Sequence, residues 1–210
     1  MRLLPPGVLA VPGGALLLLW PALANGYPLL FSDTGAFLAQ TLGDWPIWDK
    51  PYVYGPLLHL FHARVTLWGP ALAQALLLSW LLWRVLRAVR PEAGGAAHLL
   101  LVAGLALFTA APWFASQLMP DILAPALVLA LFLLGWAGEA LSWRARAGLS
   151  LVAIIAAAAH LAHLPIAAGL ALVTLALRGP RAGLRCALPL GAALVLLLAT
   201  NLAVHGRFAL

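Results

Sequence analysis

The chain has 210 residues, of which 64% are apolar and only 9% are charged, with a formal net charge of +6. A soluble domain carries roughly 25% charged residues, so this composition excludes a soluble globular protein and a disordered one. A nucleic-acid footprint needs basic residues clustered on an exposed face, whereas these stand singly or in threes beside long apolar runs, so no nucleic-acid partner is expected. The composition predicts an all-α, polytopic transmembrane helical bundle.

Long apolar runs occur along the whole chain. A helix that spans a bilayer needs about 20 mostly apolar residues. The expected segments cover residues 7–24, 68–89, 96–111, 121–141, 147–177 and 186–203. The run at 147–177 must cross out and back so that the arginines that follow it lie in the cytoplasm, and it is expected to do so as two short helices hinged at residues 160–165.

The arginines orient these segments, because cytoplasmic loops carry an excess of Lys and Arg. With the N-terminus in the cytoplasm and the 147–177 run crossing out and back, nine of the 12 basic residues lie inside. Those nine are Arg2, Arg84, Arg87, Arg90, Arg144, Arg146, Arg178, Arg181 and Arg185. The sequence therefore predicts six to seven membrane helices in one transmembrane domain over residues 1–210, in a bacterial-type plasma (inner) membrane.

Most of the remaining polar chemistry falls on the opposite, outer side. The longest outer loop, at about residues 25–67, is expected to hold two short interfacial helices at 35–42 and 57–65, the first capped by Ser32 or Asp33. The second helix would place His59 and His62 on one face. Ionisable residues near membrane depth are functional candidates, so chemistry is expected on this side.

Two acids stand at the starts of expected outer helices. Asp33 precedes the first interfacial helix, and Asp121 opens the segment at 121–141. Each has a structural interpretation, as a carboxylate that caps a helix or complements its dipole. Each has an equally weighted functional interpretation, as a carboxylate that holds a substrate hydroxyl, and the two interpretations are compatible.

Two His-x-x-His pairs stand on the outer side. His160 and His163 interrupt an apolar run. Their structural interpretation is hydrogen bonding to backbone carbonyls near Pro165, and their functional interpretations are phosphate binding, proton transfer or metal ligation. Together with His59 and His62 they would supply four metal ligands, but without a Cys or a His-Glu-x-x-His pattern this signal is weak, and no metal ligand is assigned. Cys186 is the only cysteine, so no disulfide forms within the chain.

The loop motifs resemble those of the multi-spanning type C glycosyltransferases. The resemblance is carried by Phe31-Ser32-Asp33-Thr34-Gly35-Ala36-Phe37, by Asp49-Lys50-Pro51-Tyr52-Val53-Tyr54-Gly55-Pro56-Leu57-Leu58, and by the second outer loop at 113–121. It covers about residues 20–140, and it departs from the family pattern in having a lone Asp33 in place of a paired acidic motif. The family's larger number of spans also implies that this chain is an N-terminal fragment, incomplete at its C-terminus.

The resemblance implies transfer of a sugar from a polyprenyl-phosphate donor at the extracytoplasmic face, with membrane lipid as a partner. It implies Asp33 and Asp121 as catalytic residues and leaves the cofactor open, with a divalent cation compatible. The substrate-binding candidates are Lys50, Tyr54, His59, Arg64, Gln117, His160, His163 and Arg207. The alternatives are a transporter or metal-handling protein that uses the two His-x-x-His pairs, and a non-catalytic membrane scaffold.

Overall fold

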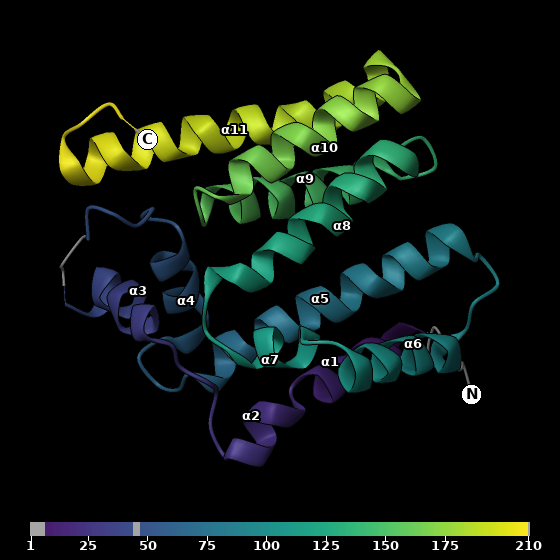
Figure 1. Ribbon diagram of the computed structural model, residues 1–210, viewed down its shortest axis with the longest axis horizontal. Helices are drawn as coiled ribbons and strands as arrows, with labels where there is room; N and C mark the ends of the chain where they lie inside the picture. Colours follow the sequence, from purple (N-terminus) through teal and green to yellow (C-terminus); the bar gives the residue numbers. More distant parts are fainter. Residues whose placement is uncertain (1–6, 44–46, 210) are drawn as a thin grey trace. The chain divides into compact units, whose positions relative to one another are not determined.

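The computed structural model describes residues 7–43 and 47–209, with side chains described from residue 9. The chain is all-α: within these residues every regular element is helical (Figure 1). The chain divides into two compact units. Unit 1 comprises Met1–Thr34 and Phe61–Ile122, and unit 2 comprises Gly35–Leu60 and Leu123–Leu210.

Unit 1 is built around α1, α5 and α6, which pack on one another. Its helices are α1 (Gly7–Leu18), α2 (Trp20–Asn25), α5 (Trp68–Val89), α6 (Gly95–Phe108), α7 (Ala111–Ser116) and the 3-10 turn η1 (Pro120–Ile122). The core combines small and large side chains, Ala15, Leu19, Ala71, Ala75 and Leu118. Small residues let helix backbones approach closely, which is typical of helix packing in membranes.

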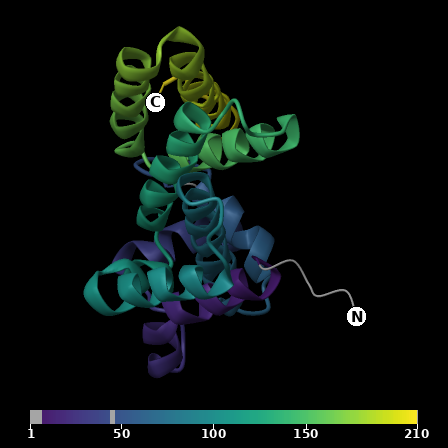
Figure 2. The same cartoon turned by 90° about the vertical axis from the view of Figure 1, so that its right-hand side faces the viewer.

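Unit 2 is a four-helix bundle of α8 (Leu123–Trp136), α9 (Trp143–Ala158), α10 (His163–Arg178) and α11 (Pro180–His205) (Figure 2). Helix α8 lies deepest, with eight of its 14 residues buried. Gly135 of α8 makes this possible, because a Cβ there would lie 2.8 Å from Thr174 Cγ2 and 3.2 Å from Cys186 Sγ. Two further helices, α3 (Ser32–Leu42) and α4 (Tyr54–His62), each pass from one unit to the other.

Among the described residues, two helices are long and apolar enough to cross a membrane, α5 and α11. Only 28% and 17% of their most apolar windows are buried, respectively. The core helix of a soluble protein would bury most of its apolar surface, so this exposure favours contact with lipid. Shorter apolar helices cover Leu9–Leu18, Gly95–Phe108, Pro120–Trp136 and His163–Arg178.

The predicted segments correspond to helices, with differences at their ends. The segment at 68–89 coincides with α5, and the 147–177 run breaks as predicted, between Ala158 and His163. The hinge is shifted, because Pro165 lies in the first turn of α10, where its missing N–H is tolerated. The first run is not one helix, because Leu19 separates α1 from α2.

The predictions for the interfacial helices were partly wrong. Helix α3 begins at Ser32, so Asp33 lies in its first turn and neither residue is the cap. Thr34 closes this turn instead, since its Oγ1 accepts a 2.9 Å hydrogen bond from Phe31 N. Helix α4 begins at Tyr54, three residues before the predicted start, and it still contains His59 and His62.

A buried polar contact joins the three main helices of unit 1. Ser79 Oγ donates to Val11 O at 2.8 Å, and it lies 3.0 Å from His98 Nε2. Because the hydroxyl has one proton and gives it to Val11, His98 must donate its Nε2–H to Ser79. Gly14 leaves room for this contact, since a Cβ there would lie 2.8 Å from His98 Nε2.

Candidate functional site

The loop after α2 and the loop after α7 pair with each other. Leu29 N donates to Ser116 O at 2.8 Å, and Leu118 N donates to Leu29 O at 3.0 Å, in a parallel bridge. Thr34 Oγ1 adds a 2.9 Å hydrogen bond to Leu118 O. We call this set of residues, Leu29, Thr34, Ser116, Gln117 and Leu118, the loop joint.

Hydrogen bonds from the neighbouring helices α5 and α2 support the loop joint. Gln74 is buried in α5, and its Nε2 donates to Ala115 O at 2.9 Å and to Gln117 O at 2.7 Å. Ser116 Oγ accepts a 3.2 Å hydrogen bond from Ala22 N of α2. A buried amide with satisfied donors fixes its partners more firmly than a loop held only by apolar contacts.

The loop joint brings together the segments that carry the two predicted catalytic acids. Asp33 directly precedes Thr34, and Asp121 follows Leu118 by three residues, in η1. Asp33 is half-buried, whereas Asp121 is exposed. Both carboxylates therefore belong to the same end of unit 1, one partly shielded from solvent and one open to it.

Aromatic side chains surround this end of unit 1. The rings of Trp20 and Trp113 meet edge to face at 5.4 Å, and those of Tyr27 and Trp68 at 6.5 Å. Trp20, Tyr27 and Trp113 are each between 43% and 51% exposed. Tryptophan and tyrosine gather at membrane–water interfaces, so this end has the character of an interface.

Losing the Gln74 amide should loosen the loop joint. Gln74→Leu removes both donors and leaves the carbonyls of Ala115 and Gln117 without them, a cost of roughly 1–3 kcal/mol. We expect a lower thermal unfolding midpoint and faster proteolysis at residues 25–31. Gln40→Leu is the control, because that amide lies in unit 2; equal loop proteolysis in both variants would contradict the role of Gln74.

Arg64 lies in a strained turn between α4 and α5. Ala63 and Arg64 have φ values of 45° and 60°, in the left-handed region that is costly for residues with a side chain. His62 holds the turn, because its buried Nδ1 accepts a 2.9 Å hydrogen bond from Arg64 N. The turn leaves the Arg64 side chain exposed in unit 1.

The strain predicts a stabilising substitution. Ala63→Gly should raise the free energy of unfolding by up to about 1 kcal/mol, since glycine adopts positive φ without the Cβ penalty. The measurement is the thermal unfolding midpoint of the purified variant. Ala88→Gly, at an exposed position within α5, is the control and should lower the midpoint; a fall for Ala63→Gly as well would contradict the strained turn.

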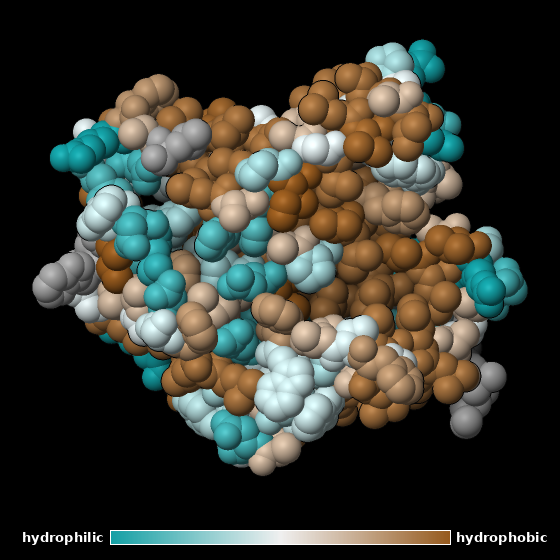
Figure 3. Space-filling view, viewed as in Figure 1, coloured by the Kyte–Doolittle hydropathy of each residue, from teal (hydrophilic) through white to brown (hydrophobic). Residues whose placement is uncertain are grey.

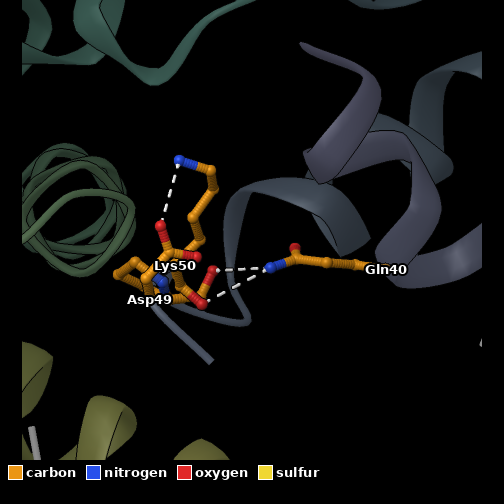
Figure 4. Close-up of polar contacts among 4 residues, drawn as sticks. Gln40, Asp49 and Lys50 are labelled. Atoms are coloured by element: carbon orange, nitrogen blue, oxygen red, sulfur yellow. Dashed lines mark hydrogen bonds and ion pairs between the residues drawn. The ribbon is translucent and has the colours of Figure 1, made fainter. Parts of the chain in front are cut away.

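Lys50 is held by its neighbours in unit 2 (Figure 4). Its ammonium lies 3.7 Å from Asp49 Oδ2 and 5.6 Å from the centre of the Phe37 ring. Gln40 Nε2 donates to Pro51 O at 3.3 Å, which fixes the loop beneath the lysine. Tyr54 is 2% exposed and its ring meets Phe37 edge to face, so this predicted binding residue occupies a packing position.

His160 and His163 lie side by side at the α9–α10 turn, with ring centroids 5.4 Å apart. His163 Nδ1 lies 2.7 Å from Ala156 O, so this nitrogen carries the proton, because a carbonyl only accepts. His160 Nδ1 accepts from Ala162 N at 3.1 Å, so the proton of the neutral ring is on Nε2. The pair therefore takes opposite tautomers, and His160 would have to give up its backbone contact or its proton to share a metal with His163.

The predicted residues fall on both units. Unit 1 holds Asp33, Asp121, Arg64 and Gln117, and unit 2 holds Lys50, Tyr54, His59, His160, His163 and Arg207. In the part of the chain that the structure describes, no three His, Cys, Asp or Glu side chains gather where they could hold a metal ion.

Sequence reasoning named Gln117 but missed the side chains whose hydrogen bonds form and support the loop joint. Thr34, Gln74 and Ser116 supply the connecting hydrogen bonds, yet none was predicted as part of a site. Gln74 gave a usable signal, because a lone amide within a 22-residue apolar helix requires a partner. The partners themselves, backbone carbonyls 41 and 43 residues away, have no sequence signature.

Comparison of the chain with protein-family models, with curated proteins and with solved structures found no match. The case for a function therefore depends on the contacts of the chain itself. Its most specific arrangement is the loop joint with the two acids beside it.

Proposed function

We propose that the chain is a polytopic membrane glycosyltransferase that transfers a sugar from a polyprenyl-phosphate donor to an acceptor hydroxyl at the extracytoplasmic face. The observation that carries the proposal is the loop joint, which ties the segments bearing Asp33 and Asp121 to one end of unit 1. The resemblance of residues 31–37 and 49–58 to the loops of type C glycosyltransferases supports it.

The membrane location is supported by the exposed apolar surface of α5 and α11. The shorter helices α1, α6, α8, α9 and α10 complete six to seven crossings in this proposal, tilted or partly shielded by their neighbours. In this proposal the chain lies in an inner membrane, and the positive-inside rule favours a cytoplasmic N-terminus. The loop joint then faces the extracytoplasmic side.

Asp33 acts as the general base. Its carboxylate accepts the proton of the acceptor hydroxyl while the hydroxyl oxygen forms a bond to the anomeric carbon of the sugar. The bond from that carbon to the donor phosphate oxygen breaks, and the phosphate leaves with the electron pair. Exposed Asp121 orients the acceptor by hydrogen bonding to it, which is compatible with its place at the solvent-facing edge.

Basic and polar side chains would stabilise the charge that develops on the leaving phosphate. Exposed Arg64 is the strongest candidate in unit 1, because its turn is fixed by His62. Gln117 of the loop joint is the other proposed binding residue in this unit. The cofactor stays open in this proposal, and the reaction steps above use only side chains of the chain.

An apolar groove in unit 1 suits the donor's hydrocarbon tail. It has a volume of about 500 Å³ and runs along α5 from Gly69 to Trp80, with Val11 and Phe61 on its walls. Gly69 lets the backbone at Phe61 pack closely on α5 beside the groove, since a Cβ there would collide with Phe61 O. A hydrocarbon chain in this groove would leave the phosphate free to approach the polar end of the unit.

The test is transfer by the purified chain in phospholipid vesicles. With a pool of polyprenyl-phosphate-linked, labelled sugars, we expect acceptor-dependent formation of glycan and release of polyprenyl phosphate in equal amounts. Vesicles without protein are the control. Donor hydrolysis without transfer, or no consumption of any donor, would contradict the proposed reaction.

A further inference from the structure

One end of unit 2 gathers five arginines. An ion pair between Arg185 Nη2 and Glu139 Oε1, at 3.7 Å, joins the N-terminal part of α11 to the α8–α9 turn. Gly138 of that turn packs on the same side chain, since a Cβ there would lie 2.7 Å from Arg185 Nε. We call this end, which carries Arg144, Arg146, Arg178, Arg181 and Arg185, the arginine end.

The charge at the arginine end is almost unopposed. Glu139 is the only acidic residue between 123 and 210, and it is paired with Arg185. The other four arginines are exposed and form no ion pair with the described residues of the chain. Five arginines and one glutamate leave a formal charge of +4 at one end of a four-helix bundle.

Apolar surface begins directly beside these charges. Leu175, Leu177, Leu184 and Leu188 are between 46% and 70% exposed on α10 and α11. Trp143 is 69% exposed, and the guanidinium of Arg144 lies 5.5 Å from its ring centre. Figure 3 shows the hydrophilic residues at the α10–α11 end next to hydrophobic surface on the same helices.

We propose that the arginine end binds the headgroups of anionic phospholipids. A guanidinium presents a planar fork of donors that matches phosphate oxygens, and basic clusters beside membrane helices attract anionic lipid. The exposed leucines provide the contact surface for acyl chains that a free phosphate ion would not need. The inference rests on the membrane location proposed above and not on the transfer reaction.

The corner between α10 and α11 concentrates the charge. Gly179 has φ +81° and ψ −179°, a conformation that favours glycine, and it reverses the chain within one residue. Arg178 ends one helix and Arg181 lies in the first turn of the next, so the two guanidiniums belong to one corner. Arg178 and Arg181 are therefore the residues to substitute in a test of the proposed lipid site.

The experiment titrates the full chain, purified in a mild detergent, with phosphatidylglycerol or phosphatidylcholine and measures bound lipid by native mass spectrometry. We expect phosphatidylglycerol to be preferred, and Arg178→Gln/Arg181→Gln to weaken its binding by roughly 30-fold at low salt. Glu139→Gln should act in the opposite direction, because it releases Arg185 and adds one positive charge.

Arg84→Gln/Arg90→Gln is the matched control, since it removes the same charge from unit 1. Equal weakening by both double variants would overturn the proposal in favour of net charge alone. Competition by inorganic phosphate at the lipid's own concentration would also overturn it, because the surface would then bind any phosphate. A chain that stays in the membrane fraction without lipid preference contradicts this inference and leaves the proposed location intact.

Discussion

Asp33→Asn should reduce sugar transfer by roughly 10²- to 10⁴-fold, the typical contribution of a general base. Asparagine keeps the size of the side chain and its place in the first turn of α3, but the amide does not accept the acceptor's proton. Because Thr34 and Leu118 still hold the turn, the fold should be retained. The loss should appear in kcat, since the substitution removes the group that accepts the proton of the acceptor hydroxyl during the reaction.

The measurement is the rate of labelled glycan formation in vesicles, with the amount of folded protein fixed by size-exclusion chromatography. Glu92→Gln, at an exposed position after α5, is the matched acid-to-amide control and should retain full activity. Asp121→Asn should raise KM more than it lowers kcat, because Asp121 orients the acceptor in the proposed mechanism. Normal product from Asp33→Asn would remove the general base from the mechanism.

Gly14→Val should have the largest effect on stability. A Cβ added at this position would lie 2.5 Å from Ser79 Oγ and 2.8 Å from His98 Nε2, so the two methyl groups of valine have no room. The substitution forces Ser79 and His98 apart and leaves fully buried polar atoms without partners. Overpacking and the lost hydrogen bonds together should lower the free energy of unfolding by about 3 kcal/mol.

Thermal unfolding in detergent, followed by intrinsic fluorescence, measures this effect. Gly104→Ala in α6 is the matched control, because nothing lies within 4 Å of the Cβ it would add. That control should leave the midpoint unchanged or raise it slightly, since alanine favours helix. An equal midpoint for Gly14→Val and the wild-type chain would contradict the close packing of α1 on α5 and α6.

The helices were predictable where the sequence carries an uninterrupted signal. The apolar run at 68–89 gave α5 its bounds, and the charge asymmetry of the arginines predicted that the run at 147–177 must break. The helix starts in the first outer loop were harder, because Ser32 and Asp33 are residue types that favour caps, yet α3 begins at Ser32 and Thr34 Oγ1 accepts from Phe31 N. Capping depends on the local backbone angles, which composition does not determine.

The site was predictable only in part. The chemistry of Asp33 and Asp121 marked them as candidates, and the loop joint ties their segments together by hydrogen bonds to backbone atoms. Every residue has a backbone carbonyl that can accept a hydrogen bond. No sequence pattern therefore predicts that Thr34 donates to Leu118 O or that Ser79 donates to Val11 O. These contacts follow from tertiary packing, which brings residues 84 and 68 positions apart together.

The proposed outward orientation of Asp33 and Asp121 is tested most directly by labelling single cysteines with a membrane-impermeant maleimide on intact cells. In a Cys186→Ser background, which removes the only thiol, each of Asp33→Cys, Asp121→Cys and Arg181→Cys is made separately. We predict that positions 33 and 121 react from outside, with exposed 121 faster than half-buried 33, and that 181 reacts only after permeabilisation. Reaction of 33 and 121 from opposite sides, or of either acid position only after permeabilisation, would contradict the account.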